Sequence, residues 1–310
     1  RQADGENNWY WFLEPTPGSS NSTLAYTGFA GLPEFSISGG FMTDAVELTL
    51  STSSADETIY YTTDGSEPTD LSNEYTDPFN INETSIIRAR TFAVSLLPSG
   101  VVTNSYLFEI DTELPVISLV TDSLNLFDWN TGIYVHGPNA SPDFPHFGAN
   151  FWEDWERAGN IELFNRYGTL ELNAGAGMKI FGGWSRGFEM KSLSFFARKQ
   201  YGNGSFNTQL FADKEISEFE SFILRNSGND WPSTMFRDAC LTSLLKDMNI
   251  DRLAYRPSVL YINGEYWGIH NIREKINEHY VASNHSDVDP DNIDLLERNA
   301  VPIEGDPDHY

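Results

Sequence analysis

The sequence is poor in cysteine and in basic residues, and it lacks long hydrophobic runs. Its single cysteine, Cys240, excludes an internal disulfide, and its apolar-periodic surroundings predict a buried structural thiol. Lys and Arg number 19 against 45 Asp and Glu, which argues against nucleic acid or an anionic membrane as the main partner. The sequence has no run of about 18 apolar residues that could span a membrane.

Apolar and aromatic residues are plentiful. Hydrophobic residues make up 40% of the 310 residues, enough for packed cores in one large domain or a few smaller ones. The chain opens with RQADGENNWYW, without an initiating methionine and without the basic and apolar regions of a secretory signal. We therefore expect the sequence to be a piece of a longer protein.

The segment from residue 29 to residue 110 has the pattern of an all-β domain. VELTLST, TIYYTT and SIIRARTFAV alternate or are rich in β-branched and aromatic residues, with turn residues between them. Within YYTTDGSEPT, Asp64-Gly65 predicts a turn and Pro68 the end of a strand. The sequence therefore predicts a small β domain here.

The pattern Tyr-Thr-x-Asp-Gly-Ser-x-Pro-Thr, together with EYTDPFNI and RARTFA, resembles the C-terminal β-sandwich of chitobiases and β-hexosaminidases. The resemblance implies an immunoglobulin-like sandwich over residues 29–110, used as a spacer or as a scaffold beside carbohydrate. Tyr60, Tyr61 and Tyr75 are either core residues or a sugar-binding surface, and alternating aromatic residues in a strand favour the core.

The first 22 residues form a separate segment. NNWYWFLEPTPGSSNS has an aromatic cluster followed by Pro15, Pro17 and Gly18, which indicates a strand that runs into a linker. The stretch resembles the end of a bacterial lamin-tail domain, so we expect residues 1–22 to be the end of such a β domain.

The composition changes near Asp111, where we place a domain boundary. GNIELFN and GMKIFG predict strands, and TMFRDACLTSLLKDM predicts an amphipathic helix capped by Ser233 or Thr234. Its apolar side would contain Met235, Ala239, Leu241, Leu245 and Met248. Residues 111–310 are therefore expected to be α+β.

The segment SVLYINGEYWGIHNIREKINEHY predicts a hairpin followed by a helix. Asn263-Gly264 is a strong hairpin signal, and the later apolar residues are spaced by four. These residues are Ile272, Ile276 and Tyr280. The spacing predicts a helix that begins at Glu274, with Lys275 facing solvent. The charged residues alone would also suit an ordinary solvated helix with a few ion pairs.

The stretch FGGWSRGFEMKSLSFFARKQYG combines small residues with cations. A turn at Gly182-Gly183 precedes Ser185, Arg186 and Lys191, the last on an expected strand. Close backbone approach and a nearby cation are what a bound phosphate requires. The spacing is not that of a Walker A loop. The alternative is a hairpin with a basic solvent face.

Two further polar stretches stand out. LRNSGNDWPSTMFRDA, residues 224–239, is dense in Arg, Asn and Asp and forms either a site or a buried hydrogen-bond network. DVDPDNID, residues 287–294, fails as a calcium loop because its sixth position is not glycine and its twelfth is Arg298. We interpret it as a turn and expect no metal site in this chain.

Four motifs in order resemble the spore-coat CotH family of atypical protein kinases. They are SRGFEMKS at 185–192, LRNSGND at 224–230, MFRD at 235–238 and NGEYWGIHNIREKI at 263–276. The resemblance runs from Pro115 to Glu297. It implies a diverged, incomplete kinase-like fold in a secreted or cell-surface bacterial protein, which uses ATP and Mg or Mn to phosphorylate protein Ser or Thr.

The resemblance also implies residue roles. In kinase-like folds a strand lysine contacts the nucleotide phosphates and a helix glutamate holds it. By analogy Lys191 is that lysine and Glu274 its partner, with Arg186 and the Gly182-Gly183 backbone as further phosphate contacts. This is the candidate ATP-binding set.

The same resemblance places the metal-binding and catalytic residues beyond Tyr310, so we expect the fragment to be inactive alone. The chain would be multidomain, an all-β sandwich followed by part of an α+β kinase-like domain. Two alternatives stay open: a surface adhesion or scaffold protein with a degenerate kinase-like region, and a carbohydrate-associated accessory protein.

Overall fold

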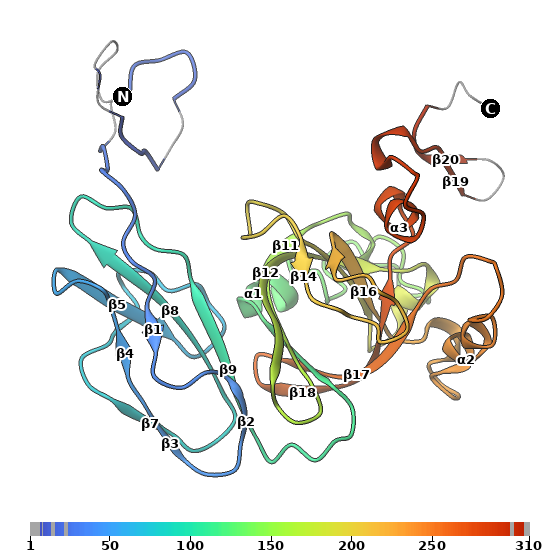
Figure 1. The fold of residues 1–310 in the computed structure, drawn as a ribbon, viewed down its shortest axis with the longest axis horizontal. Coiled ribbons are helices and arrows are strands. Elements are labelled where there is room, and N and C mark those ends of the chain that lie inside the picture. The colour runs from blue at the N-terminus through green and yellow to red at the C-terminus, as the bar shows by residue number, and fades with distance from the viewer. Residues whose placement is uncertain (1–6, 8, 14–15, 22–23, 298–300, 307–310) are drawn as a thin grey trace. The chain divides into compact units, whose positions relative to one another are not determined.

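The computed structural model describes residues 7, 9–13, 16–21, 24–297 and 301–306 of the chain (Figure 1). Strands hold 36% of the residues and helices 11%, so β-structure dominates. The chain forms two compact units. The first contains Arg1–Asp111 and Val120–Ser123, and the second contains Thr112–Leu119 and Leu124–Tyr310.

The first unit is an all-β, sandwich-like domain, as the sequence predicts. A five-stranded sheet has the order β2-β9-β8-β5-β6, and the pairs β3–β7 and β1–β4 form two small sheets. The strands are β1 (Glu34–Phe35), β2 (Gly40–Met42), β3 (Val46–Leu48), β4 (Leu50–Ser51), β5 (Glu57–Thr62), β6 (Asn73–Glu74), β7 (Phe79–Ile81), β8 (Ser85–Ala93) and β9 (Val102–Phe108). Alternation along β8 buries Ile87 and Ala89 in the core and leaves Arg88 at its edge.

The turn and the tyrosines of the first unit follow from local chemistry. Gly65 has a φ of 85°, which confirms the predicted turn, and the Asp64 carboxylate accepts the Ser66 backbone N–H at 2.9 Å. Tyr61 stacks on Phe79 with ring centroids 5.1 Å apart and packs against the core. This packing supports a core role for Tyr61.

The second unit is built on a closed barrel with the strand order β10-β11-β12-β13-β16-β18-β17 (Figure 1). These strands are β10 (Val116–Val120), β11 (Arg157–Phe164), β12 (Leu170–Phe181), β13 (Ser192–Phe196), β16 (Ser221–Arg225), β17 (Tyr255–Ile262) and β18 (Glu265–Glu274). β10 pairs with β17 in parallel, and β13, β16 and β18 pair antiparallel. A barrel has no open edge in its main sheet, which suits an isolated β domain.

Short elements surround the barrel. The helices are α1 (Ser123–Phe127), α2 (Arg237–Ser243) and α3 (Glu278–Asn284), with the 3₁₀ turns η1 (Asn150–Trp152), η2 (Trp184–Gly187), η3 (Gly228–Asp230) and η4 (Pro290–Asn292). The small strands are β14 (Phe206–Asn207), β15 (Glu218–Phe219), β19 (Leu295–Glu297) and β20 (Val301–Glu304). Helix therefore contributes little to the described part of this unit, which is more β-rich than the α+β expectation.

The barrel core is filled by inward-facing residues of alternate positions. On β16, Phe222 and Leu224 join the hydrophobic core, and on β18 Ile272 does so. Because side chains alternate along a strand, Arg225 and Arg273 point to the outer face, on which α2 lies. This alternation places Arg225 and Arg273 on the same face, where both can contact Asp238 of α2.

The hairpin prediction is confirmed, but the helix expected at Glu274 is wrong. Ile262 pairs with Glu265 across a turn in which Asn263 and Gly264 have φ of 50° and 83°. Glu274 is the last residue of β18, paired with a residue of β16, and α3 begins only at Glu278. Strand pairing with two neighbours outweighs the four-residue spacing, and Ile276 is 56% exposed.

The second predicted helix is shorter than expected and faces the other way. Phe236 occupies the N-cap without a side-chain bond, so Ser233 and Thr234 do not cap α2. The Arg237 backbone N–H instead donates to the Asp230 carboxylate at 3.0 Å. The helix thus begins against a carboxylate supplied by the preceding turn.

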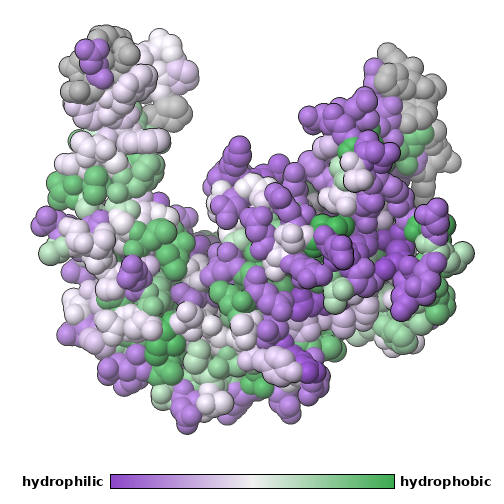
Figure 2. Space-filling view, in the orientation of Figure 1, coloured by the Kyte–Doolittle hydropathy of each residue, from purple (hydrophilic) through white to green (hydrophobic). Residues whose placement is uncertain are grey.

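Of the five apolar residues expected beneath this helix, only Ala239 is fully buried. Leu241 and Met248 are exposed, and Met235 and Leu245 are partly exposed. The neighbouring Leu244 and Ile250 are exposed as well, and Figure 2 shows hydrophobic residues over this segment. Cys240 is exposed as well, so the prediction of a buried thiol was wrong. The reason is that α2 turns Ala239 and the acidic Asp238 toward the barrel, where two arginines bind the carboxylate.

Candidate functional site

The strand register places Lys191 and Glu274 at opposite ends of the barrel sheet. Phe195 pairs with Phe222, and Phe222 pairs with Glu274. Lys191 precedes Phe195 by four residues, a separation of about 13 Å along the strand at ~3.3 Å per residue. The predicted ion pair between Lys191 and Glu274 is therefore wrong.

Glu274 is paired with a different lysine. The Lys214 ammonium donates to both carboxylate oxygens, at 2.8 Å to Oε1 and 2.6 Å to Oε2. The Ala254 backbone N–H donates to Oε2 at 2.7 Å, and the Asn284 amide donates to Oε1 at 3.3 Å. The Glu274 side chain is 3% exposed and that of Lys214 is 12% exposed. Both oxygens of the buried Glu274 carboxyl group are thus hydrogen-bonded.

Lys214 lies on the loop between β14 and β15 and makes further contacts. Its ammonium donates to the Asn284 side-chain oxygen at 2.6 Å and lies 5.2 Å from the Tyr280 ring centre. Burial, with the charges of Glu274 and Asp251, raises the pKa of Tyr280 to about 12. A single lysine in FADKEISEF offers no motif, so sequence reasoning missed Lys214. The signal that could have identified it is the register that puts Glu274 at this end.

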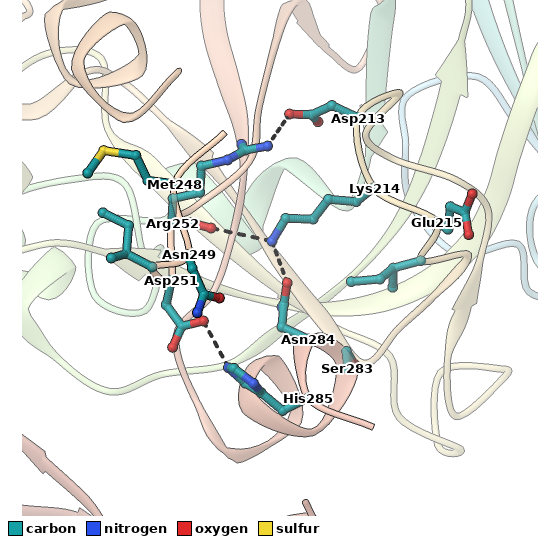
Figure 3. Close-up of a pocket in the computed structure, with 12 residues that line it drawn as sticks. Asp213, Lys214, Glu215, Met248, Asn249, Asp251, Arg252, Ser283, Asn284 and His285 are labelled. Carbon is teal, nitrogen blue, oxygen red and sulfur yellow. Dashed lines mark hydrogen bonds and ion pairs between the residues drawn. The ribbon is translucent and has the colours of Figure 1, made fainter. Parts of the chain in front are cut away.

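Lys214 borders a pocket of about 760 Å³ (Figure 3). The lining consists of residues 213–216, 248–252 and 283–285. Asp213 pairs with Arg252 at 2.6 Å, and Asp251 pairs with His285 at 2.8 Å. Figure 3 shows Lys214 extended between these pairs, with its ammonium directed at Asn284. The pocket is polar, and Lys214 is its most buried cation.

Among the residues that the structure describes, no carboxylate is in hydrogen-bond contact with Lys191. Its ammonium donates to the carbonyls of Arg186 and Phe188, at 2.9 and 2.7 Å, and lies 4.1 Å from the Phe151 ring centre. The side chain is buried, and this burial lowers the pKa of Lys191 to about 8. Its contacts are those of a cation that fixes the turn before β13.

Arg186, like Lys191, is held by backbone carbonyls and an aromatic ring. Its Nη1 donates to the Phe151 carbonyl at 3.1 Å, its Nε donates to the Gly182 carbonyl, and the guanidinium lies over the Trp152 ring. Partial burial lowers the pKa of Arg186. The guanidinium is thus occupied by backbone carbonyls of two loops.

The Gly182-Gly183 turn lines a second pocket, of about 710 Å³. Residues from both polar stretches of the sequence meet there. The lining residues are Phe181, Gly182, Gly183, Trp184, Ser185, Ser192, Arg225, Gly228, Asn229, Glu297 and Val301. The structure thus brings the glycine turn together with Arg225, and leaves Lys191, Arg186 and Glu274 outside this lining.

The polar stretch at 224–239 forms the hydrogen-bond network that was one of its two interpretations. Asp238 binds both Arg225 and Arg273 through one carboxylate oxygen. Asp230 accepts from the Thr234 hydroxyl at 2.5 Å and pairs with Arg237 at 3.3 Å. These bonds lower the pKa of Asp230. The network ties α2 and its preceding turn to the outer face of the barrel.

Two further expectations concern metals and membranes. Within the described part of the chain, no three His, Cys, Asp or Glu side chains are grouped so that they could hold a metal ion. The stretch 287–294 forms the 3₁₀ turn η4, in which the Asp289 carboxylate accepts the Asp291 backbone N–H. None of the helices in the described ranges is long and apolar enough to cross a membrane.

A β-sandwich followed by a barrel with a buried Lys–Glu pair defines a modular, mostly β protein. Comparison with known families then identifies the modules. Residues 178–308 match the family described as CotH kinase protein, and residues 37–103 match the chitobiase/beta-hexosaminidase C-terminal domain. Both resemblances are confirmed, in the expected order. A search of the curated proteins found no match.

Neither match extends to residues 1–22, where the lamin-tail resemblance stays a prediction. Part of that stretch, including residues 1–6, lies outside the described residues. The CotH match contains both barrel ends, with Lys191, Lys214 and Glu274.

Proposed function

We propose that the chain is the nucleotide-side part of a CotH-like protein kinase, which transfers a phosphoryl group from ATP to protein Ser or Thr. ATP supplies the γ-phosphoryl group, which bonds to the substrate hydroxyl oxygen and leaves ADP and a proton. The observation that carries the proposal is the buried Lys214–Glu274 pair inside the region that matches the CotH family.

The geometry fits the role of a phosphate-contacting lysine. Phosphoryl transfer in kinases relies on a lysine that is held in place by a glutamate. Glu274 binds Lys214 with both oxygens, and the Asn284 side chain and the Arg252 carbonyl accept from the ammonium at 2.6 and 3.3 Å. An ammonium has three N–H donors, so a phosphate oxygen would replace the long contact with the Arg252 carbonyl. The ammonium is therefore fixed at the border of an open polar pocket large enough for a nucleotide.

The divalent metal that the family implies does not fit the described residues. Of the carboxylates that line the pocket, Asp213 is engaged by Arg252 and Asp251 by His285. Glu215 is the third carboxylate of the lining, and the described ranges contain no cluster of three His, Cys, Asp or Glu side chains that could hold a metal ion. We therefore derive no step through a metal, and the catalytic residues stay outside this proposal.

The direct test is ATP binding, measured by calorimetry on residues 1–310. We expect Lys214→Ala to abolish binding and the conservative Lys214→Arg to restore part of it. Ser283 is exposed and lines the pocket, so Ser283→Trp should block binding without touching the ion pair. Circular dichroism of each variant checks that the fold is kept.

The matched control is Lys191→Met, which removes a lysine from the other end of the barrel. ATP binding that survives Lys214→Ala and Ser283→Trp but is lost in Lys191→Met would overturn the assignment of Lys214. A transfer assay to casein, with magnesium or manganese, adds the activity readout. In that assay we expect residues 1–310 alone to be inactive.

A scaffold role is the second candidate, and the match at residues 37–103 favours it. In this alternative the β-sandwich is the functional module and the CotH-like region is degenerate. Tyr61 packs on Phe79 and Tyr75 lies 6.3 Å from the same ring, which favours a spacer over a sugar-binding surface. Absence of ATP binding together with binding to chitin oligomers would favour a carbohydrate-associated role instead.

The domain limits are part of the same proposal. We place a lamin-tail-like end at 1–22, the β-sandwich at 29–110 and the CotH-like region at 111–310, in a secreted or surface protein of a bacterium. Limited proteolysis checks the second boundary. First cleavage between residues 108 and 114 supports it, and first cleavage within 120–260 contradicts it.

A further inference from the structure

We propose that the pocket between the Gly182-Gly183 turn and Arg225 binds a phosphate group, either inorganic phosphate or the terminal phosphate of a small ligand. Arg225 is the cation that would bind it. Lys214 and Glu274 do not line this pocket, so the inference stands apart from the proposed ATP site.

Arg225 has donors to spare. Its Nη1 donates to Asp238, and among the described residues its Nε and Nη2 have no hydrogen-bond partner. The side chain is 32% exposed and lines the pocket. A guanidinium offers five N–H donors in a planar fork that matches phosphate oxygens. The fork edge of Arg225 is therefore available to an oxyanion.

The local charge favours an anion as well. Asp238 is shared by Arg225 and Arg273, so one carboxylate balances two guanidinium groups. Arg273 is 2% exposed, and its Nε has no hydrogen-bond partner in the described part of the chain. The cluster carries a net positive charge of one in a protein whose total charge is −26. Buried guanidinium charge without a second carboxylate strengthens binding of an external anion.

The pocket walls allow close approach to the backbone. Gly182 has a φ of +107°, and a Cβ on Gly183 would meet nothing within 4 Å. Gly228 has a φ of +58°, and a Cβ there would lie 3.1 Å from Arg225 Nη2. Small residues beside a cation permit a phosphate to reach main-chain N–H groups. The Ser185 hydroxyl and the Asn229 amide belong to the same lining.

One charge opposes the anion. Glu297, on β19, lines the same pocket and is exposed. Its carboxylate repels a phosphate through partly solvated space. Removal of this charge should therefore strengthen binding, an effect in the opposite direction to the loss of Arg225.

The experiment is calorimetry on residues 1–310 at fixed ionic strength, with inorganic phosphate, pyrophosphate, ATP and adenosine as separate ligands. We expect saturable binding of phosphate and pyrophosphate. Arg225→Gln should weaken both by about tenfold or more, because it removes a positive charge and its charge-assisted hydrogen bonds to the phosphate oxygens. Glu297→Gln should tighten both. The exposed Arg166, changed to Gln, is the matched control and should leave binding unchanged.

A second blocking variant guards against a misfolded Arg225→Gln protein. Gly183→Leu introduces a side chain whose Cβ would meet no atom within 4 Å, and it should exclude phosphate from the turn. Phosphate binding that is unchanged in Arg225→Gln and Gly183→Leu overturns the inference. Loss of ATP binding in Lys214→Ala, with phosphate binding kept, would support both sites. ATP binding that depends on Arg225 and not on Lys214 would support this pocket and overturn the proposed ATP site.

Discussion

Two lysines, the buried Lys191 and the partly buried Lys214, stabilise the two ends of the same barrel in different ways. Lys214 is bound by both oxygens of Glu274, whereas Lys191 is bound by two backbone carbonyls and an aromatic ring. Burial lowers the pKa of Lys191 to about 8, because the charge of Glu189 offsets only part of the desolvation. Lys214 and Glu274 thus form a charge pair beside a pocket, whereas Lys191 fixes the turn before β13.

The comparison shows what decides the partner of a charged residue in a sheet. Lys191 and Glu274 both lie in motifs that resemble a kinase lysine and glutamate. The register through Phe195 and Phe222 sets them far apart and brings a lysine from the β14–β15 loop to Glu274 instead. The spacing of residues in a sequence suggests which charged groups could form an ion pair, and the strand register determines which of them are close enough to do so.

The largest expected effect is at the Lys214 end. Glu274→Gln leaves a buried ammonium without its countercharge, so we expect the free energy of unfolding of the barrel unit to fall by about 3–5 kcal/mol. Glu113, which is 90% exposed in its pair with Arg166, is the control. Glu113→Gln should cost less than about 1 kcal/mol. Urea unfolding followed by tryptophan fluorescence measures both, and equal losses would refute the contrast.

At the Lys191 end the expected effect is a pH dependence. The folded-state pKa of about 8 lies below the ordinary value of 10.5, so between these values the unfolded chain binds more protons. Stability should therefore rise from pH 8 to 10.5, by about 3 kcal/mol from this group. Lys191→Met should remove that rise, while the exposed Lys246→Met should keep it. A rise of the same size in the Lys191→Met variant would contradict the assignment.

A second pH effect belongs to the same end. His270 is fully buried, its Nε2 donates to the Lys191 carbonyl, and burial lowers its pKa from 6.5 to about 4. The unfolded chain binds more protons in that range, so stability should fall as pH decreases from 6.5 to 4, by up to about 3 kcal/mol. His270→Gln should flatten this part of the curve. The exposed His285→Gln is the control and should leave it in place.

The local features of the fold were predictable because their causes are local. Asn263-Gly264 adopts the positive φ of a hairpin turn with any neighbours, and the alternation of β8 identifies its buried side. Glu274 was assigned to a helix because Ile272, Ile276 and Tyr280 are spaced by four, although Ile272 lies in β18 and only Tyr280 lies in α3. Lys214 could not be identified, since its role depends on contacts 60 residues away along the chain.

The orientation of α2 was unpredictable for a related reason. An apolar period normally marks the buried side of a helix. Here the shared carboxylate of Asp238 between Arg225 and Arg273 holds the polar side inward and leaves Cys240 and Leu241 exposed. The orientation of α2 depends on Arg225 and Arg273, which point outward from their strands. That direction follows from the strand register, which the sequence pattern of the helix does not contain.

The smallest expected effect lies within the Lys214 pocket itself. It tests whether the contribution of an ion pair to the free energy of unfolding depends on its burial rather than on its location in the pocket. Asp251 and His285 line the same pocket at 2.8 Å, but their side chains are 61% and 44% exposed. Water screens such a pair, so Asp251→Asn should change the free energy of unfolding by less than about 1 kcal/mol, against 3–5 for Glu274→Gln. Raised salt should reduce the Asp251 effect further and leave the Glu274 effect nearly unchanged. A loss of stability in Asp251→Asn that matches Glu274→Gln would show that the pocket acts as one coupled network, in which Lys214 and Glu274 are not a distinct pair.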